Sequence, residues 1–246
     1  MQDEELLRYS RQIMMPDIDI AGQEKLRDAH VMIVGIGGLG SPAALYLAAA
    51  GVGKLTLVDH DQVELTNLQR QIVHDTNSLG EAKVASAERR LKALNPHVTV
   101  RPMAVKADAD TLKELLTDCD LVLDCTDNFT VRFQLNQLTW QHKVPLVSAA
   151  GIGWEGHISV FDANNEQSPC YQCLYQEGDD AALNCAENGV IAPLVGILGT
   201  TQAMEAIKMI TGVGEALIGR VLYLDAKYME WRSLKLPRLA NCPSCG

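Results

Sequence analysis

The sequence predicts an α/β fold built on a doubly wound, mostly parallel β-sheet. Between residues 29 and 150, short apolar runs alternate with helix-forming segments, and a glycine-rich turn joins the first apolar run to the helix after it. Strands that alternate with helices imply βαβ units and therefore parallel pairing. A polar, helix-prone arm over residues 1–28 precedes the parallel part. After residue 150 we expect the sheet to continue with a mixed or antiparallel part.

The element boundaries follow from the apolar patterns and from residues that start or stop helices. The expected strands are residues 31–34, 55–58, 98–105, 121–123, 144–149, 156–161 and 221–224. The expected helices are residues 42–50, 82–94, 128–142 and 195–210. Pro42 suits a first helical turn, Gly51 and Gly212 suit helix ends, and Asn95-Pro96 stops the second helix. No linker-like stretch appears, so we expect one continuous sheet rather than two separable domains.

Composition and charge exclude several classes of protein. The 246 residues include 31 Asp and Glu against 21 Lys and Arg, a formal net charge of −10, which disfavours binding to the phosphate backbone of nucleic acids. The charged opening MQDEE lacks the apolar core of a secretory signal, and no run reaches the roughly 18 apolar residues of a membrane span. Seven cysteines without an export signal predict a cytoplasmic protein with reduced thiols.

The glycine-rich turn spans residues 35–40, with the sequence GIGGLG, and lies between an expected strand and an expected helix. Glycines there allow a tight turn and let backbone N–H groups approach a phosphate at the helix N-terminus. Asp59, at the end of the second strand, is placed to accept hydrogen bonds from ribose hydroxyls. The candidate phosphate contacts are Gly37, Gly38, Leu39 and Gly40. The motif does not separate ATP from NAD, so an NAD-dependent oxidoreductase remains an alternative, as does a turn needed only for packing.

A polar stretch after Asp59 supplies further candidates for a polyphosphate site. They are Asp61, Asn67, Gln69 and Arg70, followed by Lys83 at the start of the next expected helix. A cation at a helix N-terminus opposes the helix dipole, and a bound polyphosphate would reverse that cost. The alternative is that Lys83 and Arg70 are solvated surface cations without a function.

A second carboxylate, Asp127, follows the strand at residues 121–123. Ligands of open α/β sheets bind beyond the carboxyl ends of the strands, so Asp127 is expected to face the same crevice as the glycine loop. Beside a bound triphosphate it would suit Mg²⁺, which prefers oxygen ligands. The competing interpretation makes Asp127 only the N-cap of the helix that begins at Asn128.

Four of the cysteines form two C-x₂-C pairs. Four thiolates from two such pairs close a tetrahedral Zn²⁺ site, and four ligands leave no open position, so the zinc would be structural. It would tie the end of this sequence to the loop after the strand at residues 156–161. A redox C-x₂-C motif is the alternative. The predicted ligands are Cys170, Cys173, Cys242 and Cys245.

The other cysteines divide into two kinds. Cys119 and Cys125 lie on or beside an apolar strand and are expected to be buried packing residues. Cys185 follows a polar segment and is either a nucleophile or an ordinary loop thiol. Of the six histidines only His60, next to Asp59, is expected near the nucleotide site, and no role is assigned to it.

Taken together, these stretches resemble the MoeB/ThiF family of ubiquitin-activating-enzyme-like adenylyltransferases, which have a Rossmann-like nucleotide-binding sheet. The resemblance covers nearly the whole chain. The matching stretches are RYSRQI at residues 8–13, GIGGLG at 35–40, NLQRQ at 67–71, DCTDN at 124–128, CYQC at 170–173 and CPSC at 242–245.

The resemblance implies ATP-dependent adenylation of the C-terminal glycine of a small ubiquitin-like sulfur carrier. The implied partner is a MoaD- or ThiS-like protein ending in Gly-Gly, in molybdopterin or thiamine biosynthesis. Residues 29–150 would then form a nucleotide-binding half, and residues 151–246 a half that binds the carrier and zinc. A non-catalytic adaptor for ubiquitin-like proteins is a further alternative.

The resemblance also implies roles for individual residues. Asp59 would bind ribose and Asp127, beside Asn128, would organise Mg²⁺. Arg11 would be contributed across a homodimer interface to the other protomer's nucleotide. The residues implied to hold the polyphosphate are Asn67, Arg70 and Lys83. In thiamine-type relatives the cysteine that matches Cys185 takes part in sulfur transfer, whereas adenylation is the task of the molybdopterin-type relatives.

Overall fold

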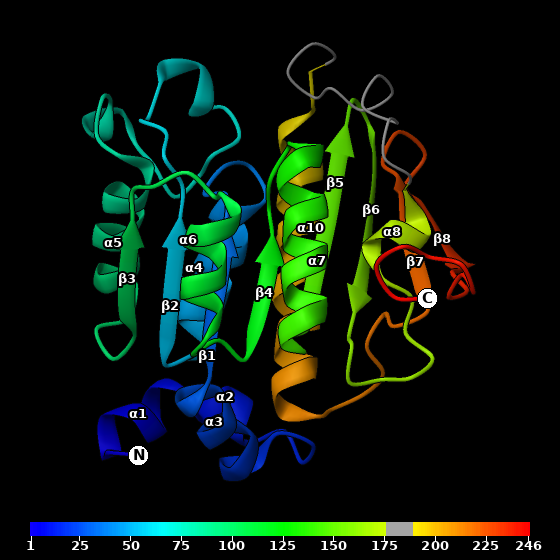
Figure 1. Ribbon diagram of the computed structural model, residues 1–246. Coiled ribbons are helices and arrows are strands. Elements are labelled where there is room, and N and C mark those ends of the chain that lie inside the picture. Colours follow the sequence, from blue (N-terminus) through cyan, green and yellow to red (C-terminus); the bar gives the residue numbers. More distant parts are fainter. Residues whose placement is uncertain (176–188) are drawn as a thin grey trace.

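One eight-stranded sheet runs through the molecule in the order β3-β2-β1-β4-β5-β6-β7-β8 (Figure 1). The computed structural model describes residues 1–175 and 189–246. Neighbours among the first five strands pair in parallel, and β6 to β8 continue the sheet antiparallel, which confirms the predicted α/β fold. The strands are β1 (His30–Val34), β2 (Lys54–Val58), β3 (Thr99–Met103), β4 (Leu121–Asp124), β5 (Leu146–Ile152), β6 (Glu155–Phe161), β7 (Arg220–Asp225) and β8 (Glu230–Lys235).

Helices cover both faces of the sheet, with α7 and α10 on opposite sides (Figure 1). Alternate residues of β1 therefore enter different apolar cores: Val31 and Ile33 pack with α4, α5 and α10, whereas Met32 and Val34 pack with α6, α7 and α8. The α-helices are α1 (Asp3–Arg8), α2 (Ser10–Ile13), α3 (Asp19–Asp28), α4 (Gly40–Ala50), α5 (Lys83–Leu94), α6 (Ala109–Leu116), α7 (Phe129–His142), α8 (Tyr171–Leu174) and α10 (Ala192–Thr211), and short 3-10 turns span Leu65–Asn67 and Thr76–Ser78. None of the helices in the described ranges could cross a membrane.

The predicted elements are present, with small shifts at their ends. Helix α10 begins at Ala192 rather than at residue 195, because Pro193 lies in its first turn, where proline needs no N–H partner. Both Gly51 and Gly212 adopt the left-handed conformation that ends α4 and α10, as expected.

Within residues 1–175 and 189–246, the α-helices and strands that were not predicted are α6, α8 and β8. All six residues of β8 are exposed, so the strand lacks the apolar alternation by which a half-buried strand is recognised. It forms one edge of the sheet, and β3, which contains Pro102, forms the other. The helix α8 has only four residues, which is too short for a helical period to show in the sequence.

The N-cap of α7 is Asn128, not Asp127, so the capping interpretation of Asp127 is wrong. The Asn128 side chain accepts a hydrogen bond from Val131 N at 3.1 Å, and the helix begins at Phe129. The one-residue shift leaves the Asp127 carboxylate outside the helix.

This assignment predicts different effects for two neighbouring substitutions. Asn128→Ala should lower the free energy of unfolding by about 0.5–2 kcal/mol, because the first turn of α7 loses its side-chain acceptor. Asp127→Ala should change it by less than about 0.5 kcal/mol, as expected of an exposed position. Urea unfolding followed by circular dichroism measures both, and the reverse order would contradict the assignment.

Candidate functional site

A cavity of about 660 Å³ opens at the carboxyl ends of β1, β2 and β4, where the strand order reverses. Residues far apart in sequence meet there because parallel strands end at the same edge of a sheet. Most of the nucleotide-site residues predicted from the sequence line this cavity. They are Gly37, Gly38, Leu39, Asp59, Asp61, Gln69, Arg70, Lys83, Asp127 and Asn128.

Two predicted residues, Gly40 and Asn67, do not line the cavity and instead shape the loops that do. A Cβ atom at Gly40 would lie 2.0 Å from the carbonyl oxygen of Gly35, so close packing of the backbone requires glycine at this position. The Asn67 side chain accepts from Glu64 N at 3.1 Å, and its backbone carbonyl accepts from Arg70 N at 3.1 Å. Asn67 therefore forms the turn that presents Arg70 to the cavity.

The two remaining predicted residues are Arg11 and Cys185. Arg11 is exposed on α2, which lies beyond the amino ends of the parallel strands, at the opposite end of the sheet from the cavity (Figure 1). Cys185 lies outside the described residues.

Two kinds of contact fix the glycine loop. Gly35 has a φ of +90°, and a Cβ there would lie 2.7 Å from the carbonyl oxygen of Cys125, so only glycine fits between β1 and the chain after β4. Asp59 accepts a hydrogen bond from Ile36 N at 2.7 Å through one oxygen and from Asp61 N at 2.9 Å through the other. The loop leads into α4, whose N-terminal N–H groups and dipole favour an anion.

Lys83 is buried, with 6% of its surface exposed, so its interpretation as a solvated surface cation is wrong. It is the first residue of α5, and its Nζ atom lies 2.8 Å from an oxygen of Asp61. Burial raises the pKa of Asp61, but the hydrogen bond and charge of Lys83 hold it below its ordinary value. Arg70, which is half-buried, donates to the carbonyl of Thr66 at 3.2 Å. Two cations therefore stand beside the glycine loop.

His74 is the histidine that supports the loop, which corrects the expectation that only His60 lies near the site. Its Nε2 atom is 3.1 Å from the carbonyl oxygen of Ile36, and its Nδ1 atom is 3.0 Å from the hydroxyl of Ser86. Burial lowers the pKa of His74, which favours the neutral ring. The sequence places His74 only a few residues after NLQRQ, but nothing in the local pattern shows that the chain folds back onto the loop.

A buried ion pair beneath the cavity was also missed. Arg132 of α7 lines the cavity, and its Nε atom lies 3.6 Å from a carboxylate oxygen of Asp124, which is fully buried at the end of β4. Asp124 also accepts hydrogen bonds from the hydroxyl groups of Ser148 at 2.6 Å and Thr126 at 2.7 Å. An arginine in the interior of a helix and an aspartate at the end of an apolar strand were the available signals, but their pairing depends on the tertiary structure.

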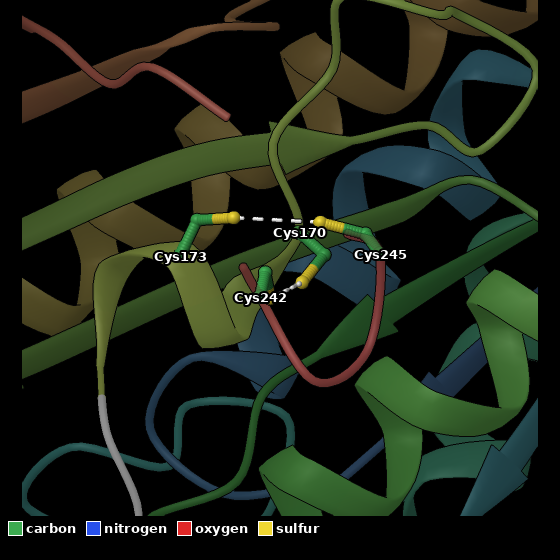
Figure 2. Close-up of side chains that lie close together, drawn as sticks. All are labelled: Cys170, Cys173, Cys242 and Cys245. Carbon is green, nitrogen blue, oxygen red and sulfur yellow. Dashed lines mark hydrogen bonds between the residues drawn. The ribbon is translucent and has the colours of Figure 1, made fainter. Parts of the chain in front are cut away.

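The four predicted metal ligands form one cluster, shown in Figure 2. Their sulfur atoms all lie within 4.8 Å of one another, and the Cys170–Cys242 and Cys173–Cys245 sulfur atoms are each 3.5 Å apart. Tetrahedral zinc with Zn–S bonds of about 2.3 Å requires sulfur separations of about 3.8 Å. The donor set and its dimensions are compatible with zinc. Each short contact joins one C-x₂-C pair to the other, which disfavours a separate redox motif in either pair.

The other two described cysteines are buried, as predicted. Burial raises the pKa of Cys119 to about 12. Burial and the neighbouring Asp124 carboxylate raise the pKa of Cys125 well above its ordinary value, so both thiols are poor nucleophiles.

A glycine loop at the switch point of a doubly wound sheet, two adjacent cations and an exposed carboxylate define a nucleotide-binding α/β protein with a separate four-cysteine cluster. The profile of the ThiF family matches residues 9–244, and the chain belongs to this family.

Relatives resemble the chain over its whole length. It is 47% identical over 246 residues to the molybdopterin-synthase adenylyltransferase of Salmonella typhimurium, covering all of this chain and 98% of that protein. It is 43% identical to the sulfur carrier protein ThiS adenylyltransferase of Escherichia coli, covering all of this chain and 97% of that protein. Among solved structures, Escherichia coli MccB with ATP superposes with a TM-score of 0.85 at 25% identity, covering 97% of this chain and 74% of that one.

Proposed function

We propose that this protein is an adenylyltransferase that uses ATP to activate the C-terminal carboxylate of a small ubiquitin-like sulfur-carrier protein ending in Gly-Gly. The observation that carries the proposal is the convergence of the glycine loop, Lys83, Arg70 and Asp127 on one cavity. The full-length similarity to adenylyltransferases of both molybdopterin synthase and ThiS supports the reaction and the kind of partner.

In this proposal the triphosphate lies against the glycine loop, with backbone N–H groups of Gly37 and Gly38 and the N-terminus of α4 directed at it. Lys83 and Arg70 neutralise its charge, and Asp61 holds the Lys83 ammonium group at 2.8 Å in the cavity wall. Asp59, besides fixing Ile36, presents its remaining acceptor capacity to the ribose hydroxyls.

The reaction requires positioning and charge neutralisation more than acid–base chemistry. A carboxylate oxygen of the carrier attacks the α-phosphorus of ATP and forms a new P–O bond. The bond from that phosphorus to the bridging oxygen of pyrophosphate breaks, and pyrophosphate leaves with the electron pair. The attacking carboxylate is already ionised at neutral pH, so the enzyme needs no general base, and cations fixed in advance supply the stabilisation.

Mg²⁺ fits the residues at the mouth of the cavity. Asp127 is exposed, lines the cavity and lies outside α7, so its carboxylate is free of the capping role that Asn128 performs. A carboxylate is the kind of oxygen ligand that Mg²⁺ takes beside substrate phosphates, where the ion would neutralise phosphate charge.

We also propose a homodimer in which Arg11 reaches the nucleotide of the partner subunit. Arg11 cannot serve as a ligand of the cavity in its own chain, because it lies at the other end of the sheet. The arm around it exposes several large apolar side chains, which a second copy would cover: Leu7, Met14, Met15 and Ile20.

The four-cysteine cluster is proposed to hold a structural zinc ion, which ties residues 170–173 to residues 242–245. The reduced thiols of this site and of the buried Cys119 and Cys125 suit the cytoplasm.

The proposal divides the chain into three parts: residues 1–28 are the arm, residues 29–150 bind the nucleotide, and residues 151–246 bind the carrier and zinc. A role for Cys185 in sulfur transfer, and the choice between molybdopterin and thiamine biosynthesis, depend on which carrier is the substrate.

The adenylation reaction predicts carrier-dependent exchange of labelled pyrophosphate into ATP. Asp127→Ala should lower the exchange rate about 100-fold or more, the effect of removing a group that organises transition-state charge. Asp110→Ala, at an exposed carboxylate of α6, is the matched control and should retain full exchange.

Absence of exchange with every candidate carrier would refute adenylation. Binding of NAD(H) in place of ATP would favour the oxidoreductase, and carrier binding without turnover would favour the adaptor.

If Arg11 of one subunit completes the nucleotide site of its partner, two inactive variants should complement each other. Arg11→Ala and Lys83→Ala should each abolish exchange as homodimers. Mixing them should restore part of the activity, because one site of the mixed dimer has Lys83 from one subunit and Arg11 from the other. If Arg11 acts within its own chain, both sites of the mixed dimer are defective and no activity returns.

The zinc site predicts about one zinc ion per chain in the purified protein, measured by elemental analysis. Cys242→Ser should reduce the zinc content strongly, because a hydroxyl does not replace a thiolate ligand. Cys119→Ala should leave it unchanged, since Cys119 lies outside the cluster. Equal zinc loss in both variants would point to unfolding rather than to loss of a ligand.

A further inference from the structure

Helix α7 contacts both the nucleotide cavity and the four-cysteine cluster along one face. Arg132, Asn136 and Trp140 are spaced four residues apart, so they lie on the same side of the helix. Arg132 lines the cavity, and Trp140 packs against the cysteine cluster. Asn136 lies between them and is only 1% exposed. One rigid element therefore connects the two sites.

The Asn136 side chain holds both C-x₂-C segments of the cluster. Its amide oxygen accepts a hydrogen bond from Tyr171 N at 2.8 Å, and Tyr171 lies between Cys170 and Cys173. Its amide nitrogen donates to the hydroxyl of Ser244 at 3.2 Å, and Ser244 lies between Cys242 and Cys245. The buried Asn136 amide thus uses its acceptor on one segment and its donor on the other, and the two segments are distant in sequence.

The two segments are also joined to each other beside this amide. The Ser244 hydroxyl donates to the side-chain oxygen of Gln172, which neighbours Tyr171. The ring of Tyr171 packs edge-on against Phe133 of α7, with centroids 5.6 Å apart. A metal ion that fixes the four sulfur atoms would therefore fix the position of α7 through Asn136.

At the other end of the same face, Arg132 determines the shape of the loop that carries Asp127. Its guanidinium group donates to the carbonyl of Thr126, the residue directly before Asp127, and to the carbonyl of Ala149 at 3.4 Å. It also faces Asp124 at 3.6 Å. A shift of α7 would move this guanidinium group and, with it, Thr126 and Asp127 at the cavity.

We propose that Asn136 is a positioning residue that couples the cysteine-bound zinc ion to the nucleotide cavity through α7. The inference rests on the proposed function, since it takes ATP as the ligand of the cavity. Coupling between two binding sites is reciprocal, so zinc that orders the cavity for ATP must be held more firmly once ATP is bound. A residue that only satisfies buried hydrogen bonds at the metal site would not produce this linkage.

The test measures zinc release from the zinc-loaded, full-length protein into an excess of a chelating dye, with and without Mg-ATP. Calorimetry measures ATP binding to the same samples. In the wild-type protein, bound ATP should raise the affinity for zinc about 5-fold or more, within the usual range of coupling between sites. At an unchanged association rate, zinc release slows by the same factor. Free ATP that chelated zinc would accelerate release, so slower release reports the coupling.

Asn136→Ala should release zinc about 10-fold faster, the usual effect of losing a residue that orients metal ligands. The decisive result is that ATP should no longer slow release in this variant, although it still binds. Gln137→Ala, at the exposed neighbouring position, is the matched control and should keep the wild-type release rate and protection. If Asn136→Ala is too unstable to retain zinc, Ser244→Ala removes one of the two bonds and should lose part of the protection.

The outcomes separate this inference from the proposed function. If ATP binds but leaves wild-type zinc release unchanged, the coupling is refuted and the proposed function stands. If Asn136→Ala releases zinc faster but ATP still slows release by the wild-type factor, Asn136 only supports the metal site and the proposal is wrong. If ATP does not bind at all, both the coupling and the nucleotide site are refuted.

Discussion

The reversal of strand order between β1 and β4 is the constraint on which the arrangement of the site depends. Because β2 and β3 extend from one side of β1 while β4 and β5 extend from the other, the connections after these strands diverge and leave a crevice. The glycine loop, Asp59 and Asp127 each follow a strand that ends at this crevice. The sheet topology brings these three features together, whereas the local sequences determine which functional groups they carry.

The fold and most of the cavity lining could be predicted because their signals are local. The buried parallel strands are apolar runs, and the glycine loop and the two C-x₂-C pairs are short motifs with fixed spacing. The burial of Lys83, the support of the loop by His74 and the pairing of Arg132 with Asp124 could not be predicted, since each requires two distant segments to meet. The cap of α7 was misplaced by one residue because Asp127 and Asn128 are both good caps.

Buried charge ties together the groups beneath the cavity. An isolated Asp124 inside the protein would be strongly unfavourable, and Arg132, Ser148 and Thr126 together compensate it. Removing one partner of such a pair typically costs about 3–5 kcal/mol, because the other charge is left buried. The groups beneath the cavity therefore depend on one another, whereas Asp127 at its mouth is exposed.

The two edge strands of the sheet bear on how the protein behaves at high concentration. An open sheet edge is a template for strands of other chains and a starting point for aggregation. At one edge, β3 contains Pro102, which has no N–H group to offer an incoming strand. At the other, β8 is lined with charged side chains, among them Glu230, Arg232 and Lys235, which discourage stacking of like strands. The charged side chains that keep β8 from reading as a half-buried strand in the sequence are thus the ones that discourage uncontrolled polymerisation at this edge.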